Sequence, residues 1–207
     1  MTKPRVIFLL GPPKAGKATQ CATLAEKHDG WVNLKLSALI QQEARNAEST
    51  HASLFAAAVS EGRPLPAELL LLVLKRALLE NVTSGRQNFF IAGFPASLPQ
   101  LDAWERALGP YVDAVCAVFL DCPYEVAIKR TSSPLPLDAW QQAYVTVQTV
   151  CKAFDNQGKL RKVSGVGSPE DVTKKLERTL VDVFGRTMPS WVQRPQRLLP
   201  AVSPANA

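Results

Sequence analysis

The sequence predicts an α/β protein in which helices cover both faces of a five-stranded parallel sheet. Short apolar runs rich in β-branched and aromatic residues alternate with longer segments of helical periodicity, the order typical of parallel strands joined by crossover helices. The first apolar run, at 5–10, is followed by a glycine-containing turn and a helical pattern. The 207 residues, 46% of them hydrophobic and 20% charged, suffice for one domain with a buried core.

The elements follow in a regular order along the chain. The expected strands are 5–10, 31–34, 88–92, 114–120 and 160–164. The expected helices are 17–28, 38–47, 50–61, 67–82, 98–108, 124–131, 137–155 and 168–184. The last helix has the clearest start, since Ser168 suits the N-cap, Pro169 suits the first turn and two acidic residues follow.

The amino-acid composition of the chain changes after Gly185. Residues 186–207 contain four prolines and three arginines and no acidic residue, so we predict a domain at 1–185 and an extended tail at 186–207. One interpretation of the tail is a frayed terminus. The other is a segment that docks on protein partners, with Trp191, Leu198 and Leu199 as apolar anchors between prolines.

The composition limits which binding partners and which cellular compartment we expect. The net charge of +6 suits an anionic ligand such as a nucleotide, but basic and aromatic residues do not interleave, so nucleic acid is not an expected partner. Basic pairs such as Lys75–Arg76 are expected to be solvated. The run 69–74 is too short to cross a membrane and the first strand begins near the start, so we expect a soluble cytoplasmic protein without membrane contact.

The cysteines and histidines do not form a metal-binding pattern. The four cysteines are far apart in sequence, and neither histidine lies near a cysteine. We therefore expect no structural metal, and we expect the cysteines to be small buried hydrophobic residues.

The segment GPPKAGKATQ, at 11–20, indicates a phosphate-binding loop. Gly11, Gly16 and Lys17 match G-x-x-x-x-G-K between a strand and a helix, where backbone N–H groups and the lysine meet phosphate oxygens. The hydroxyl residue comes one position later than in the strict pattern, because Ala18 precedes Thr19. We expect ATP or ADP, with Mg²⁺ held through water by Thr19; the alternative is a turn that has lost its ligand. The expected contacts are Gly11, Pro13, Lys14, Ala15, Gly16, Lys17, Ala18 and Thr19.

With its hydroxyl one place later, this loop resembles that of the adenylate kinase family. The resemblance continues through 61–70, 88–100, 118–130 and 157–165, and so covers about residues 4 to 184. It implies a P-loop kinase fold that transfers a phosphoryl group from ATP to a nucleoside monophosphate. It also implies roles for Lys17 in catalysis, Arg130 at the donor nucleotide, and Gly93 and Gln100 on the monophosphate side.

The resemblance is uneven at the charged positions. Gln41 stands where the family has an arginine that grips the monophosphate, and Ala92 and Ala96 replace an aspartate and an arginine. The aspartate organises magnesium-bound water in the family, and the arginine holds phosphate. We expect Arg45 to lie on the surface, the alternative being that it reaches in from the next helical turn.

Two further segments depart from the family pattern: the phosphate-binding loop and the segment that corresponds to the family's lid, which closes over the nucleotide. Lys14 replaces a glycine at a position that often needs a positive φ. Ala18 also replaces a glycine. Beyond Arg130 the segment 131–158 has no arginine, and Ala139 stands near the place of a lid arginine. The prolines of 134–136 predict a short, stiff connector.

Three hypotheses follow from these departures. The first is a nucleotide-binding pseudokinase that serves as a structural subunit of a larger assembly, since the family contributes such domains to ciliary axonemes. The second is a working nucleoside-monophosphate kinase in which Lys14, Arg45 or Arg63 replaces the missing cations. The third is a P-loop protein that acts on another phosphate acceptor.

Overall fold

Five parallel strands form the centre of the molecule. The computed structural model describes residues 2–133 and 135–184, so the tail at 186–207 lies outside the described residues. The strand order is β2-β3-β1-β4-β5, which confirms the predicted fold class. Four strands have the predicted bounds, and β4 extends one residue further at each end because Asp113 pairs with Arg5 and Asp121 with Ser164. The strands are β1 (Arg5–Leu10), β2 (Trp31–Leu34), β3 (Asn88–Ala92), β4 (Asp113–Asp121) and β5 (Leu160–Ser164).

The helices lie close to their predicted ranges. They are α1 (Lys17–Lys27), α2 (Leu36–Ala44), α3 (Ala52–Glu61), α4 (Ala67–Thr83), α5 (Leu98–Ala107), α6 (Tyr124–Ile128), α7 (Leu137–Asn156) and α8 (Pro169–Phe184). The prediction of 124–131 was too long for α6, because the chain turns after Ile128 and the Arg130 and Thr131 N–H groups bond three residues back. At α8, Ser168 and Asp171 exchange side-chain and backbone hydrogen bonds, which confirms the predicted N-cap.

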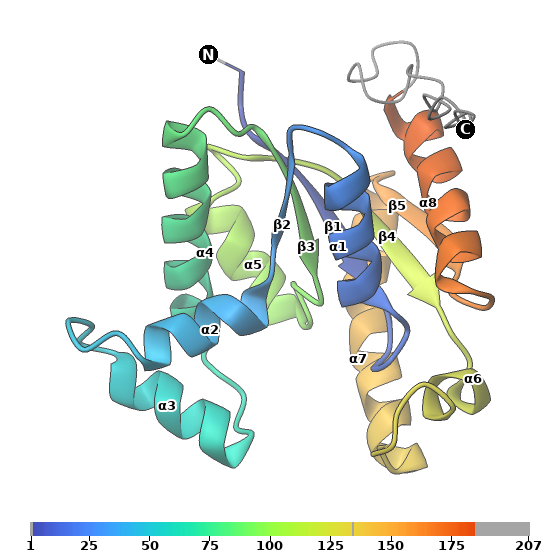
Figure 1. The fold of residues 1–207 in the computed structure, drawn as a ribbon, viewed down its shortest axis with the longest axis horizontal. Helices are drawn as coiled ribbons and strands as arrows, with labels where there is room; N and C mark the ends of the chain where they lie inside the picture. Colours follow the sequence, from blue (N-terminus) through green and yellow to red (C-terminus); the bar gives the residue numbers. More distant parts are fainter. Residues whose placement is uncertain (1, 134, 185–207) are drawn as a thin grey trace, which may run out of the picture.

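The alternation of β1 divides the core between the two faces of the sheet. Val6, Phe8 and Leu10 belong to the cluster that includes residues of α4, α5 and α7. Ile7 and Leu9 point the other way, into the cluster that includes residues of α1 and α8. Figure 1 shows this arrangement, with α1 and α8 on one side of the sheet and α4 and α5 on the other. Buried on both faces, β1 is apolar at five consecutive positions.

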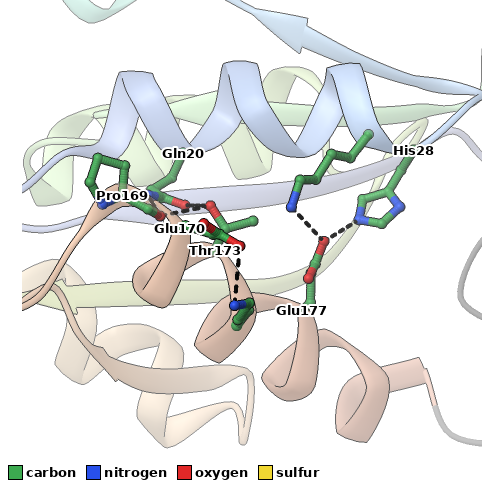
Figure 2. A network of polar contacts seen from close by, with 8 residues as sticks. Gln20, His28, Pro169, Glu170, Thr173 and Glu177 are labelled. Atoms are coloured by element: carbon green, nitrogen blue, oxygen red, sulfur yellow. Dashed lines mark hydrogen bonds and ion pairs between the residues drawn. The ribbon is translucent and has the colours of Figure 1, made fainter. Parts of the chain in front are cut away.

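A buried polar network joins α1 to α8 (Figure 2). The Gln20 side chain donates to the Pro169 carbonyl at 2.9 Å and accepts from the Thr173 hydroxyl at 2.8 Å. At the other end of α1, His28 Nε2 lies 3.1 Å and Lys27 Nζ 3.9 Å from Glu177 Oε1. Because Gln20 and Thr173 are fully enclosed and satisfied, they fix the start of α1 against the start of α8.

Two arms flank the end of the sheet at which the loop after β1 lies. Figure 1 shows α2 and α3 on one side and α6 on the other, with the loop 11–16 between them. In the part of the chain that the structure describes, no helix has the length and apolarity to cross a bilayer. The four cysteines are buried, as predicted.

Candidate functional site

The backbone of the loop 11–16 has a conformation that requires two of its glycines. Gly11 has φ 143°, and a Cβ there would lie 2.5 Å from the Leu120 carbonyl oxygen of β4. Gly16, at φ 98°, is the N-cap of α1, so the loop runs directly into the positive end of that helix. The turn is held by the Ala15 N–H, which donates to the Pro12 carbonyl at 3.3 Å. Strand, loop and helix thus have the arrangement in which loop N–H groups and a helix N-terminus can hold phosphate, and we call the loop 11–16 with the start of α1 the cradle; that it binds phosphate stays a prediction.

Lys14 occupies the left-handed region, with φ 62°. It is the one non-glycine residue with positive φ among residues 2–133 and 135–184. The sequence-based expectation of a positive φ at this position is therefore confirmed. The residue is exposed, and holding an L-residue in this conformation costs about 1–2 kcal/mol.

The Lys17 side chain folds back over the loop. Its ammonium donates to the carbonyls of Gly11, at 2.8 Å, and Pro12, at 2.7 Å. Burial lowers the pKa of Lys17 to about 8, against the smaller opposing influence of Cys21 and Cys122. The lysine is thus within the cradle, held by carbonyls that a phosphate group would replace as its partners.

The other predicted loop residues differ in accessibility. Ala15 is buried and Pro13 is half-buried, whereas Ala18 and Thr19 are exposed in the first turn of α1. Thr19 is therefore accessible to solvent near the start of α1. That Thr19 holds Mg²⁺ stays a prediction.

Arg130 connects the loop 11–16 with the loop between β5 and α8. Its guanidinium donates to the carbonyls of Ala15 at 3.1 Å and Gly165 at 2.7 Å, with a longer bond of 3.4 Å to Gly167. It also lies 3.7 Å from Cys122 Sγ. These bonds place Arg130 beside the cradle in a role that the motif did not indicate, because sequence spacing does not tell which carbonyls approach a guanidinium.

A cavity adjoins the loop 11–16 on the side of α2. It has a volume of about 390 Å³ and is lined by residues of α2, α3, the segment 62–65 and α4, together with Gly93 and Ala96 after β3 and Gln100 of α5. We call it the acceptor-side cavity. A Cβ on Gly93 would lie 3.6 Å from Lys17 Cε, so this cavity begins next to the loop lysine. Gln100 Oε1 accepts a hydrogen bond from the Ala96 N–H at 2.8 Å.

The residues considered as replacement cations are not gathered at this cavity. Arg45 lies along a neighbouring hollow with Gln42 and Asn46. Arg63 lines the acceptor-side cavity but pairs with Glu61, and its side chain is 70% exposed. Gln41 and Ala96, which carry no charge, also line the cavity.

Arg76, expected to be solvated, instead pairs with a buried carboxylate. Its guanidinium donates to Glu43 Oε2, and Ser49 Oγ donates to Glu43 Oε1 at 2.5 Å. The bond from Arg76 is the main cause that lowers the pKa of Glu43. Because Glu43 is on α2 and Arg76 on α4, this pair fixes the arm that carries Gln41. The sequence feature that could have indicated this ion pair is Glu43 itself, an acidic residue in a helix whose other residues are uncharged.

The segment between α6 and α7 is anchored by aromatic residues. Tyr124 Oη donates to the Leu135 carbonyl at 3.0 Å, and its ring packs against Trp140, which stacks on Tyr144 with centroids 5.2 Å apart. Ala139 is exposed on the first turn of α7. Pro134 lies outside the described residues. The connector is short, as predicted, since α6 ends at Ile128 and α7 begins at Leu137.

A cavity of greater volume lies at the opposite end of the sheet. It has a volume of about 750 Å³ and is lined by Arg5 and Asp113, where β1 and β4 begin, and by Gln87. Ligands of open parallel sheets bind outside the carboxyl ends of the strands. The loop and the acceptor-side cavity, at those ends, are therefore the candidate site despite their smaller volume.

Comparison with known proteins relates the chain to one family of kinases. The sequence model of the adenylate kinase family matches residues 9–189. The chain is 30% identical to the UMP-CMP kinase of Homo sapiens over 184 residues, which is 82% of this chain and 93% of that protein. It is 29% identical to the UMP-CMP kinase of Xenopus tropicalis over 89% of this chain and 98% of that protein. With the Gallus gallus protein of the same name the identity is 30%, over 84% and 95%.

Proposed function

Because the chain belongs to the adenylate kinase family, we propose that it binds ATP or ADP at the loop 11–19 but transfers phosphoryl groups poorly. The nucleotide phosphates lie on the N–H groups of the loop and the start of α1, and Lys17 turns from the Gly11 and Pro12 carbonyls to the phosphate oxygens. Thr19 would hold Mg²⁺ through water, and the ion would supply positive charge that neutralises the phosphates.

The distribution of cations carries this proposal. Phosphoryl transfer depends on positioning and on charges that stabilise the transferring group. Here Arg130 is committed to backbone carbonyls, and Arg63, the one cationic residue among the described lining of the acceptor-side cavity, is exposed and paired. One arginine contributes about 10³- to 10⁵-fold in rate, or roughly 4–7 kcal/mol of barrier. The loss of even one such contact accounts for very slow turnover.

The proposed role of the whole protein is that of a structural subunit of a larger assembly, such as the axoneme of a cilium. The basis is the composition of the tail 186–207, with Trp191, Leu198 and Leu199 as the proposed anchors on a protein partner. Co-sedimentation of the purified chain with axonemes tests this role. We expect binding that Trp191→Ala weakens; equal sedimentation of both proteins contradicts docking through the tail.

An active nucleoside-monophosphate kinase is the second candidate. It is favoured by the preserved cavity beside Lys17, with Gln100 in its wall, and by about 30% identity to proteins named UMP-CMP kinase over nearly their whole length. In this alternative the acceptor is AMP or another nucleoside monophosphate.

A coupled assay of ADP formation decides between the two candidates. The purified chain is incubated with ATP, Mg²⁺ and AMP, UMP or CMP, with Lys17→Ala as the inactive control and Lys75→Ala, at an exposed position of α4, as the matched control. We expect ATP binding by calorimetry that Lys17→Ala weakens, together with rates equal to those of Lys17→Ala. Turnover near the roughly 1–100 s⁻¹ of kinases that disappears in Lys17→Ala but persists in Lys75→Ala contradicts the proposal.

A further inference from the structure

The cavity at the amino ends of the strands has an apolar floor. It has a volume of about 750 Å³ and lies where β1 and β4 begin, at the end of the sheet opposite the loop 11–16. We call it the amino-end cavity. Four buried side chains of the core form its floor, namely Leu101, Trp104, Val112 and Phe154. Since small-molecule pockets measure roughly 300–1,000 Å³, the cavity has room for a ligand with a large apolar group.

Charged side chains of both signs surround this floor. Lys3 and Lys159 line the cavity, and so do Asp113 and Glu105. Within residues 2–133 and 135–184, the two lysines and Asp113 form no ion pair. The Glu105 carboxylate already accepts a hydrogen bond from Gln157 Nε2 at 3.1 Å. The lining therefore offers two ammonium groups and one carboxylate that have no charged partner in the described part of the chain.

The start of β1 holds two polar lining residues in place on either side of it. Arg5 pairs in register with Asn88 of β3 and with Asp113 of β4, so Gln87 and Asp113 flank the start of β1. The Arg5 N–H donates to the Gln87 carbonyl at 2.7 Å, and the Asp113 N–H donates to the Pro4 carbonyl at 2.8 Å. These backbone bonds fix the positions from which both side chains reach the cavity.

The side-chain oxygen of Gln87 is an unsatisfied acceptor. Gln87 Oε1 is enclosed and receives no hydrogen bond from the residues that the structure describes. Buried polar atoms nearly always have a partner, because an unpaired one keeps the cost of its desolvation. Since Gln87 lines the amino-end cavity, an N–H group of a ligand bound there can supply the missing donor.

We propose that the amino-end cavity binds a free amino acid with a large apolar side chain. The α-carboxylate binds the ammonium groups of Lys3 and Lys159, and the α-ammonium donates to the Asp113 carboxylate and Gln87 Oε1. The apolar side chain packs on the floor. A zwitterion suits this lining because an anion leaves Asp113 unpaired and a cation leaves both lysines unpaired. The inference concerns binding alone, goes beyond the proposed function and does not rest on it.

Titration calorimetry of the full chain with four matched probes tests the inference. L-Phenylalanine carries all three groups, whereas 3-phenylpropionate lacks the ammonium, 2-phenylethylamine lacks the carboxylate and L-alanine lacks the ring. We expect L-phenylalanine to bind with a dissociation constant of about 1 mM or tighter, and each of the other probes to bind at least about tenfold more weakly. A truncated probe that binds as tightly as L-phenylalanine overturns the inference, and so does no saturation by L-phenylalanine at about 10 mM.

Removal of the carboxylate tests the assigned partner of the α-ammonium. We expect Asp113→Asn to weaken the binding of L-phenylalanine and of 2-phenylethylamine by about tenfold, while 3-phenylpropionate binds no more weakly. A folding defect would weaken all three probes, so the selective loss reports the contact itself. Asp102→Asn is the matched control, since Asp102 is exposed on α5 and does not line the cavity. Equal effects of the two variants overturn the assignment.

Removal of the lysines should give the opposite selectivity. We expect Lys3→Ala/Lys159→Ala to weaken L-phenylalanine and 3-phenylpropionate by about tenfold and to leave 2-phenylethylamine no weaker. Lys75→Ala/Lys152→Ala is the matched control, because it removes the same charge at two exposed positions outside the cavity. If the control has the same effect, the loss comes from net charge and the assignment of the cavity is wrong.

The inference and the proposed function fail in different measurements. Lys17→Ala is expected to weaken ATP binding and to leave L-phenylalanine binding unchanged, because the loop and the amino-end cavity lie at opposite ends of β1. If the chain binds L-phenylalanine but not ATP, the proposed function is wrong and the cavity assignment holds. If ATP binds and L-phenylalanine does not, the cavity assignment is wrong and the loop proposal holds.

Discussion

The Lys17 ammonium donates a hydrogen bond to the Gly11 carbonyl at 2.8 Å, from one end of the phosphate loop to the other. The Pro12 carbonyl accepts a second bond at 2.7 Å. The lysine therefore has two carbonyl partners within the loop, and burial nevertheless lowers its pKa to about 8. Binding of a phosphate exchanges neutral carbonyl oxygens for charged ones, which favours the protonated form of Lys17.

Triphosphate affinity is predicted to fall as the pH rises above 8. Below that pH the lysine is already charged, so binding takes up no proton at Lys17. Between pH 8 and the ordinary lysine value of 10.5, the free protein loses the proton that the complex keeps. The ATP dissociation constant should then rise by up to about tenfold per pH unit. Calorimetry from pH 7 to 10 measures it, and Lys17→Met should give a flatter profile; parallel profiles contradict the assignment.

The left-handed conformation of Lys14 predicts an unusual order of stability. Glycine at this position should make the protein about 1 kcal/mol more stable than alanine does, because only glycine adopts φ 62° without strain. Urea unfolding of Lys14→Gly and Lys14→Ala measures the difference. At Lys174, exposed inside α8, the order should reverse, with glycine about 0.5–1 kcal/mol less stable. A less stable Lys14→Gly contradicts the conformational argument.

Arg130→Lys is predicted to loosen the two loops that the guanidinium joins. One ammonium cannot reproduce the separate bonds of Nη1 to Ala15 and Nη2 to Gly165, so about 1–2 kcal/mol of stability should be lost. Hydrogen exchange should increase in 11–16 and 165–168, and ATP should bind more weakly. Lys129→Ala, at the exposed neighbour, serves as the control. Unchanged exchange in both loops excludes the bridging role.

Thr173→Val tests the contact between α1 and α8. Valine keeps the shape but leaves the buried Gln20 oxygen without its donor, at a cost of about 1–3 kcal/mol. Thr179→Val is the matched control, since the Thr179 hydroxyl donates to the Lys175 carbonyl of its own helix. Thermal unfolding of both variants should show a clearly larger loss for Thr173→Val. Equal losses mean that the network does not bind the helices together.

The sequence by itself determined the order and kind of the elements. The apolar runs of β1 and β3 and the periodicity of α4 and α7 depend on local patterns, and these elements have the predicted bounds to within a residue or two. The loop motif also predicted a strand, a glycine turn and a helix around Lys17, because glycine spacing constrains the backbone directly, and the resemblance predicted the positive φ of Lys14. Gln41, Ala96 and Gln100, which the resemblance assigned to the monophosphate side, line one cavity.

Only the tertiary structure decided how the charges are used. Arg130 bonds to Ala15 and Gly165, Arg76 to Glu43, and Arg63 to Glu61. A long cationic side chain can reach several partners, and the distant backbone that approaches it is set by packing. The mostly apolar wall of the acceptor-side cavity is likewise a property of segments far apart in sequence, brought together by the arm of α2 and α3 and the end of β3.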